Sequence, residues 1–213
     1  MADLILTPEV TNCVSASRDR QREVLETEET DRTLAAIREK AADLGRWIGI
    51  GSLALRDPLA GDERFVNRSF LIAPDGSVQA RYDKIHMFDV EVTETETYRE
   101  SEGYRPGARA AVADLGQTRI GLTICYDVRF PHLYRDLAKA GAAIILVPSA
   151  FSPVTGAAHW ETLLRARAIE TGAFILAAAQ SGRGGQRNPA DRGRIKVIGD
   201  FHHHLPALTG AHQ

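Results

Sequence analysis

An apolar run over residues 118–124 leads directly into Cys125, and a helix-like stretch follows from Pro131. A strand that turns this sharply into a helix exposes the residue at the turn. The N–H groups that open the helix then favour a thiolate and a developing oxyanion. The pattern therefore predicts a strand–turn–helix unit with a reactive thiol at its elbow. The alternative is that Cys125 is simply a small buried apolar residue, which is a common fate of a lone cysteine.

Strand-like and helix-like patterns alternate along the chain, which predicts α/β architecture with mostly covered sheets. The segments expected to form strands are 47–55, 65–73, 77–82, 143–147 and 174–179. The segments expected to form helices are 131–140, 157–171 and the stretch before Gly45 that follows the charged residues 18–31. The apolar residues expected to point inward from these helices include Leu34, Ile37, Ala41, Leu44, Trp160, Leu163, Leu164 and Ile169. The polar stretch 83–107 has no clean period and reads as a long functional loop.

Composition narrows the class of protein. With 213 residues, 44% of them hydrophobic, the chain can bury one sizeable core. A net charge of −2 gives no reason to expect nucleic acid or an anionic membrane as a partner. No apolar run approaches the roughly 20 residues that span a bilayer, and no signal peptide opens the chain, so we expect a soluble cytoplasmic protein. Two cysteines do not suggest a disulfide framework, and Cys13 is interpreted as a spectator.

Two further ionisable residues stand at the ends of predicted strands. Glu9 follows the short apolar segment 3–8, and Lys84 follows the segment 77–82. Open α/β sheets collect their chemistry at the carboxyl ends of strands. A carboxylate, an ammonium and a thiol that converge there would supply a base, an oxyanion stabiliser and a nucleophile for acyl transfer. Taken singly, Glu9 and Lys84 would more often be solvated surface charges.

The order Glu9, Lys84, Cys125 and the sequences around these residues resemble a known family. The segments that carry the resemblance are 6–9, 82–86, 98–101, 121–131, 148–151 and 159–170. They are similar to the nitrilase-like carbon-nitrogen hydrolases, which carry a Glu-Lys-Cys triad in this chain order. Within that family the chain looks most like the branch related to deaminated glutathione amidase and ω-amidase.

The resemblance implies an α-β-β-α sandwich and a second glutamate, matched here by Glu100, that accompanies the triad lysine. Without the resemblance, Glu100 would be taken for a solvated loop acid. It implies no metal and no organic cofactor. It also implies pairing of sandwiches into a homodimer or higher homo-oligomer, for which the helices 131–140 and 157–171 are available.

The chain departs from the family pattern at both ends, so we expect a sandwich that is incomplete there. Family members carry a further strand and helix before the segment that matches residues 2–9. After Gln180, the tract 181–194 is almost devoid of apolar residues. We therefore expect a hydrolase domain over 1–180 and a mobile tail over 181–213, with one short strand available at 195–198. A run of three histidines at 202–204 is read as a solvated terminus rather than a metal site.

The function expected from these observations is hydrolysis of a small linear amide through a cysteine thioester. Cys125 would be the nucleophile and Glu9 the base, while Lys84 and the backbone N–H of Tyr126 would hold the oxyanion. Four residues near the elbow are candidates for the substrate pocket: Arg129, Phe130, Phe151 and His159.

The resemblance to this branch implies a substrate that carries a carboxylate, which Arg129 could bind. Alternatively, Arg129 could form an ion pair with Glu161 or Glu170. Two other readings of the whole chain stay open. The first is a Cys-His hydrolase that uses His86 or His159. The second is an inactive relic of the family that acts at most as an interaction partner.

Overall fold

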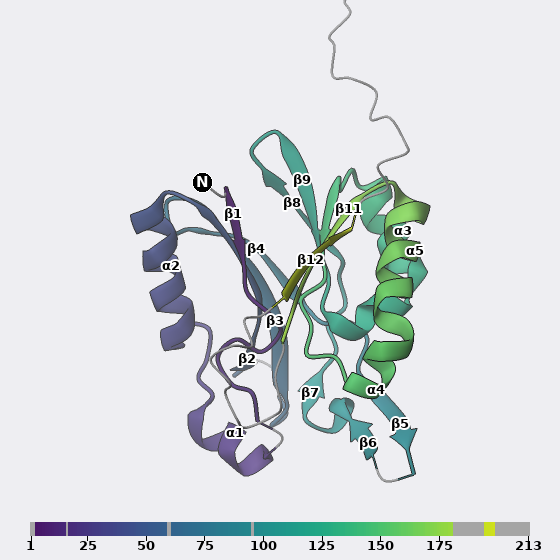
Figure 1. Cartoon of the computed structure of the whole chain (residues 1–213). Coiled ribbons are helices and arrows are strands. Elements are labelled where there is room, and N and C mark those ends of the chain that lie inside the picture. The colour runs from purple at the N-terminus through teal and green to yellow at the C-terminus, as the bar shows by residue number, and fades with distance from the viewer. Residues whose placement is uncertain (1–2, 16, 59–60, 95, 181–193, 199–213) are drawn as a thin grey trace, which may run out of the picture.

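The computed structural model describes residues 3–15, 17–58, 61–94, 96–180 and 194–198 (Figure 1). Most of its strands form two sheets of five. The strands of the first sheet are β1 (Leu4–Leu6), β2 (Trp47–Arg56), β3 (Phe65–Ile72), β4 (Val78–Asp83) and β7 (Tyr104–Arg105). The strands of the second sheet are β8 (Ala111–Leu115), β9 (Thr118–Leu122), β10 (Ile144–Leu146), β11 (Phe174–Ala179) and β12 (Arg194–Ile198). A separate pair consists of β5 (Asp89–Thr93) and β6 (Glu96–Arg99).

Both sheets mix parallel and antiparallel pairs. In the first sheet β1 runs parallel to β2, with Leu4 opposite Trp47, and β2, β3 and β4 are antiparallel neighbours. In the second sheet β9, β10 and β11 are parallel, while β8 and β12 pair antiparallel at the two edges. The parallel strands bring the ends of β9 and β10 to the same edge of the sheet, where the predicted nucleophile follows β9.

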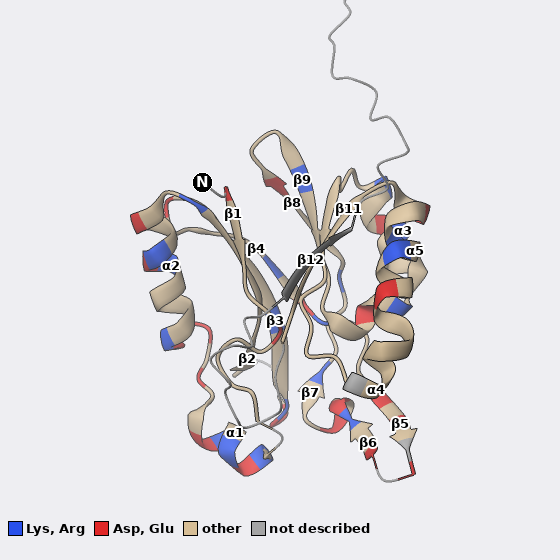
Figure 2. Cartoon of the chain, viewed as in Figure 1, with Lys and Arg blue, Asp and Glu red and all other residues tan. Residues whose placement is uncertain are grey.

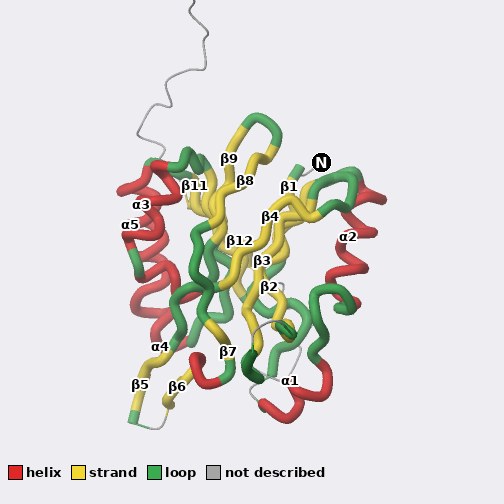
Figure 3. Tube along the Cα trace, turned by 180° about the vertical axis from the view of Figure 1, so that it is seen from behind, coloured by secondary structure: helices red, strands yellow, loops and turns green. Residues whose placement is uncertain are grey.

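The helices cover the outer faces of the two sheets. The α-helices are α1 (Arg18–Val24), α2 (Arg32–Leu44), α3 (Pro131–Lys139), α4 (Pro153–Thr155) and α5 (Glu161–Thr171). The shorter turns are the 3₁₀ helices η1 (Glu100–Glu102) and η2 (Cys125–Arg129) and the π-helical turn η3 (Gly156–Trp160). Figures 1 and 3 show α2 outside the first sheet and α3 and α5 outside the second. The predicted α-β-β-α sandwich is confirmed.

The layers are held together by three apolar clusters. One joins α2 to the first sheet and another joins α3 and α5 to the second. The third lies between the sheets, where Leu71 of β3 and Tyr82 of β4 pack with Ile120 and Leu122 of β9. Burial of such side chains contributes roughly 1.5–3 kcal/mol each, so this central layer fixes how the two sheets face one another.

The ends of α2 show why this segment is a helix. The Asp31 carboxylate accepts a hydrogen bond from the Leu34 N–H at 2.7 Å, which caps the first turn. Gly45 ends the helix in the left-handed region, with φ of 58°, where glycine avoids the strain that a side chain would suffer. The glycine stop predicted from the sequence is confirmed.

Some side chains lie differently from the sequence expectation. Ile169 is 63% exposed and Leu44 is 46% exposed, so neither belongs to the inward face predicted for its helix. The helix predicted at 157–171 is α5 preceded by the π-helical turn η3. The polar stretch 83–107 is not a continuous loop, because it contains the β5–β6 pair, η1 and β7. The predicted short strand near the C-terminus is present as β12, whereas residues 181–193, 199–213 and the histidine run lie outside the described residues.

Many of the charged residues lie on the helices and in the outer loops, as the colours of Figure 2 show. Within the described part of the chain, no helix is long and apolar enough to cross a membrane. A few ionisable residues are nevertheless buried, among them Glu9, Lys84, Asp127 and Arg167. Charged side chains are rarely buried without partners, so these residues indicate a network of polar contacts inside the sandwich.

Candidate active site

Cys125 stands at the turn between β9 and η2, in the predicted strand–turn–helix unit. Its φ of 48° lies in the left-handed region, which a residue with a side chain adopts only when its surroundings enforce it. The Cys125 N–H donates to the Pro148 carbonyl at 2.8 Å, and the Asp127 N–H donates to the Ile124 carbonyl at 3.1 Å. These bonds hold the turn between the ends of β9 and β10.

The thiol itself differs from the sequence expectation. Cys125 is only 8% exposed, because the turn faces into the space between the two sheets. Burial raises the pKa of the thiol well above its usual value, and the Glu9 carboxylate raises it further, while Lys84 acts in the opposite direction. The expected thiolate is therefore replaced by a neutral thiol beside the Glu9 carboxylate.

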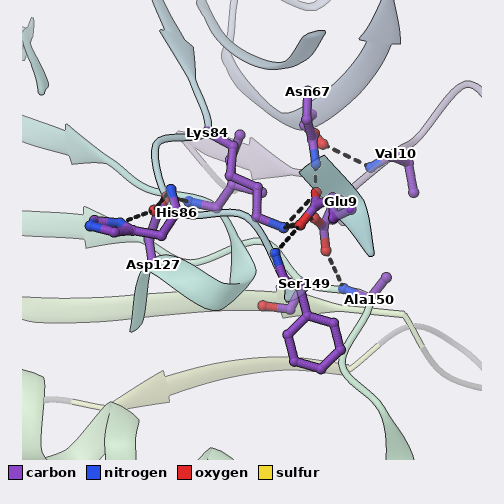
Figure 4. A network of polar contacts seen from close by, with 12 residues as sticks. Glu9, Val10, Asn67, Lys84, His86, Asp127, Ser149 and Ala150 are labelled. Carbon is purple, nitrogen blue, oxygen red and sulfur yellow. Dashed lines mark hydrogen bonds and ion pairs between the residues drawn. The ribbon is translucent and has the colours of Figure 1, made fainter. Parts of the chain in front are cut away.

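Glu9 follows β1 and projects into the same buried space, with 5% of the residue exposed. Its Oε1 accepts hydrogen bonds from Asn67 Nδ2 at 3.0 Å and from Lys84 Nζ at 3.1 Å. Its Oε2 accepts one from the Ala150 N–H at 2.8 Å. Figure 4 shows the carboxylate between these three donors. The donors hold the ionised carboxylate in place beside the thiol.

The backbone around Glu9 is also constrained. Val10 has a φ of 47°, which is unusual for a β-branched residue, and its N–H donates to Ser52 Oγ at 2.8 Å. The Glu9 carbonyl accepts a hydrogen bond from Gln180 Nε2 at 2.7 Å. Glu9 and Cys125 therefore both lie at tightly fixed turns.

Lys84 is 2% exposed and comes directly after β4. Its Nζ lies 2.9 and 2.8 Å from the two carboxylate oxygens of Glu100 and 3.1 Å from Glu9 Oε1. Burial alone lowers the pKa of Lys84, but the charges of Glu100 and Glu9 outweigh it and raise the pKa well above its usual value. Lys84 therefore stays an ammonium in the folded chain.

Glu100 lies in η1, at the end of the β5–β6 pair. Besides its two contacts with Lys84, its Oε2 accepts the Phe88 N–H at 2.7 Å. The structure thus brings together the four residues predicted as catalytic: Glu9, Lys84, Glu100 and Cys125. One ammonium between two carboxylates leaves this cluster with a formal charge of −1 beside a neutral thiol.

The candidate oxyanion donor and pocket residues lie around the elbow. Tyr126 directly follows Cys125 in η2. The Arg129 guanidinium lies over the rings of Tyr126 and Phe151, at 5.7 and 5.8 Å from their centres, and its NH2 is 3.1 Å from His159 Nδ1. Phe130 instead stacks on His86, with ring centres 3.6 Å apart.

The alternative ion pairs for Arg129 are not found in the described part of the chain. Glu161 pairs with Arg165 at 2.8 Å, and Glu170 pairs with Arg167. In the described part of the chain, Arg129 is therefore held by ring faces and an imidazole.

The two histidines considered as bases are engaged elsewhere. His86 Nδ1 lies 2.7 Å from Asp127 Oδ1, and His159 Nδ1 takes the contact with Arg129. Neither imidazole hydrogen-bonds to Cys125 among the described residues, and the carboxylate that raises the pKa of the thiol is Glu9. Within the same residues, no group of three or more His, Cys, Asp or Glu side chains is placed to hold a metal ion.

The sequence analysis missed several residues that build the site. Asn67, the Ala150 N–H and Gln180 all hold Glu9, and Asp127 holds the elbow. A sequence signal existed for Asn67, since it is a polar residue in the middle of the apolar strand β3. The contact from Ala150 carries no such signal, because any residue other than proline has a backbone N–H.

Comparisons with known proteins show which proteins this chain is similar to. The chain is 51% identical over 150 residues to the deaminated glutathione amidase of Yersinia enterocolitica, covering 70% of this chain and 52% of that protein. The crystal structure of the NitFhit protein of Caenorhabditis elegans matches with a TM-score of 0.79 and 35% identity, covering 92% of this chain and 47% of that one.

A third match is a variant of the Nesterenkonia sp. AN1 amidase that carries acrylamide added at its active-site cysteine. Its TM-score is 0.68 with 28% identity, over 84% of this chain and 65% of that one. The chain spans about half the length of the curated relatives it matches. The pattern of the carbon-nitrogen hydrolase family matches residues 1–202, and the chain belongs to this family.

Proposed function

We propose that this chain is an amidase that hydrolyses a small linear amide to a carboxylate and ammonia through a thioester on Cys125. The observation that carries the proposal is the buried cluster in which Glu9 contacts the Lys84 ammonium and raises the pKa of the buried Cys125 thiol. A neutral thiol needs a base to take its proton before it becomes a nucleophile, and we assign that role to Glu9.

The first half of the proposed reaction forms the thioester. Glu9 accepts the proton of Cys125 as Sγ attacks the amide carbon. The carbonyl oxygen gains negative charge, which the Lys84 ammonium and the Tyr126 N–H stabilise. Loss of one such donor costs about 3–4 kcal/mol of transition-state stabilisation in other enzymes. The proton held by Glu9 then passes to the departing nitrogen, and ammonia leaves.

The second half hydrolyses the thioester. Glu9 takes a proton from water, and the resulting hydroxide attacks the thioester carbonyl in the same oxyanion site. Collapse of the adduct returns the proton to Sγ and releases the carboxylate. Glu100 keeps Lys84 charged and oriented throughout, because its carboxylate contacts Nζ with both oxygens. The proposed chemistry uses only these side chains and water.

The proposed substrate carries a carboxylate of its own. Arg129 lies beside Tyr126, next to the nucleophile, and beside Phe151, next to the Ala150 N–H that holds Glu9. A guanidinium held by two ring faces is a suitable partner for a carboxylate. Relatives are named deaminated glutathione amidase, which supports testing amides of this class first.

The substrate proposal is tested with a matched pair of amides. The mono-amide of succinic acid carries a carboxylate, and butyramide is a neutral amide of the same chain length. Arg129→Gln should raise KM for the acidic amide about 10–100-fold, since a hydrogen bond to a charged group contributes about 1.5–3 kcal/mol. The KM for butyramide should not change. Equal effects on both amides would contradict a carboxylate site at Arg129.

The same substrates separate the proposed triad from the Cys-His reading. Glu9→Gln should stop ammonia release, whereas His86→Asn and His159→Asn should retain turnover. A histidine variant as inactive as Glu9→Gln would overturn the assignment of the base. Absence of turnover in the unmodified chain, with every amide of the panel, would favour the inactive relic. We further propose a homodimer or higher homo-oligomer, which sedimentation of the purified chain tests.

A further inference from the structure

Asp127 is a fully buried carboxylate that the proposed chemistry does not use. Its Oδ2 accepts hydrogen bonds from the Ile124 N–H at 2.9 Å and the Tyr82 hydroxyl at 2.7 Å. Its Oδ1 accepts the His86 N–H at 3.1 Å and contacts His86 Nδ1 at 2.7 Å. Four contacts around one carboxylate use its acceptor capacity, which explains how this polar group is accommodated inside the sandwich.

One of these contacts, from the Ile124 N–H, acts on the nucleophile elbow. Ile124 directly precedes Cys125, and Asp127 follows it by two positions, so the carboxylate closes a small ring around the strained turn. The Phe130 N–H also donates to the Asp127 carbonyl at 2.9 Å. A left-handed φ at Cys125 persists only where the surrounding bonds determine it, and Asp127 supplies two of those bonds.

The other contacts of the carboxylate act on the segment that carries Lys84. Tyr82 and His86 lie two residues before and two residues after Lys84. Figure 4 shows His86 and Asp127 on one side of Lys84 and Glu9 on the other. A single carboxylate therefore joins the end of β9 to the end of β4, two strands that belong to different sheets.

We propose that Asp127 is a positioning residue that holds the Cys125 thiol at the correct position relative to Lys84 and Glu9. This inference rests on the proposed amidase function for its kinetic part, and on the geometry alone for the position of the thiol. Asp127 acts through the elbow and touches no reacting atom. Misplacement of a reacting group by about 1 Å can lower the rate about 100-fold, so the position of the thiol matters for catalysis.

Replacement of Asp127 by asparagine tests the proposal because it keeps the shape and removes one acceptor. If the NH2 group faces Ile124 and Tyr82, the Ile124 N–H loses its acceptor. If it faces His86, the His86 backbone N–H loses its acceptor. In either orientation the side chain loses a hydrogen bond to the elbow or to the segment that carries Lys84, while its volume is nearly unchanged.

The position of the thiol is read from its infrared S–H stretching band. Cys13→Ser provides a background with one thiol, and Cys125→Ser identifies the band. Asp114→Asn is the matched control, since Asp114 is an exposed residue of β8 that pairs only with Arg119 in the described part of the chain. Thermal melts followed by circular dichroism show whether each variant is folded, and ammonia release gives kcat and KM.

We expect the S–H band of Asp127→Asn to move to higher wavenumber, because the thiol moves away from the Glu9 carboxylate, its expected acceptor. We expect kcat to fall about 10–100-fold with KM within about twofold of the control. A folded Asp127→Asn chain whose band matches that of Asp114→Asn overturns the proposal, whatever its kcat.

If Asp127→Asn does not fold, Tyr82→Phe is used to test whether the Asp127 contacts position the thiol. It removes one hydroxyl and leaves the other three contacts of the Asp127 carboxylate. A shift of the band in the same direction supports the proposal, and an unchanged band overturns it. Absence of amide turnover in the unmodified chain would refute the amidase proposal, while the infrared comparison would still decide the role of Asp127.

Discussion

Replacing Glu100 by glutamine tests how the buried Lys84 ammonium is held. Both oxygens of the Glu100 carboxylate contact Nζ, at 2.9 and 2.8 Å, and one of them also accepts the Phe88 N–H. Glutamine has nearly the same shape but only one acceptor oxygen. In either orientation its NH2 group faces the ammonium, so a donor meets a donor inside the fold.

The magnitude follows from what Lys84 keeps and what it loses. Removing one partner of a buried ion pair costs about 3–5 kcal/mol, and losing one hydrogen bond to a charged group costs about 1.5–3 kcal/mol. Glu9 still pairs with Lys84, so the lower range applies, and we expect a loss of about 2–3 kcal/mol in the free energy of unfolding. For a chain of this size that lowers Tm by about 4–12 °C.

The pH dependence has a definite sign. Burial lowers the pKa of Lys84, but Glu100 and then Glu9 raise it to well above its usual value. A group with a raised pKa in the folded state stabilises the fold fully below its unfolded pKa of about 10.4, and this stabilisation is lost as the pH rises through the folded pKa. Glu100→Gln removes the stronger of the two raising charges. Its alkaline loss of stability should therefore begin at a lower pH.

The assay is thermal unfolding followed by circular dichroism at neutral and alkaline pH. Glu102→Gln is the control, because Glu102 lies in the same turn, η1, with an exposed side chain. We expect Glu102→Gln to melt with the unmodified chain and Glu100→Gln to melt earlier, with a lower kcat. If both variants melt at the same temperature and hydrolyse amides equally well, Glu100 does not hold Lys84 as described.

Two further changes test the surroundings of the thiol. Glu9→Gln in a Cys13→Ser background removes a charge that raises the pKa of Cys125, so the ultraviolet absorbance of the thiolate should appear at lower pH; an unchanged or higher midpoint would contradict the contact. Gly51→Ala should reduce both Tm and turnover, because its Cβ would lie 2.2 Å from the Thr7 carbonyl oxygen, in the segment that leads to Glu9. Normal melting and turnover in Gly51→Ala would show that this segment can move without consequence.

Local pattern together with the family resemblance singled out Glu9, Lys84 and Cys125. Glu9, Lys84 and Cys125 each follow a recognisable strand, and the residues around them match a family pattern. Glu100 was identified only through the resemblance, because an acid in a polar stretch has no local feature that separates it from a solvated one. The local sequence could not predict the burial of the Cys125 thiol, because that burial depends on the packing of the other sheet.

The features that the sequence did not predict arise from tertiary contacts or weak periodicity. The Ala150 N–H and Glu9 are separated by 141 positions, and neither local sequence predicts the contact between them. The segment 161–171 has apolar residues on more than one side, so its period does not determine the buried face and Ile169 was misplaced. The alternation around Val90 and Val92 is a strand signal that was overlooked in the stretch taken for a loop.

The central claim is that Cys125 becomes acylated by an amide with loss of ammonia. The most direct measurement is mass spectrometry of the chain after brief mixing with an amide substrate, followed by peptide mapping. We predict an added acyl group on the peptide that contains Cys125, together with ammonia in solution, and no adduct in Cys125→Ser. An adduct on Cys13 instead, or ammonia release that persists in Cys125→Ser, would contradict this account.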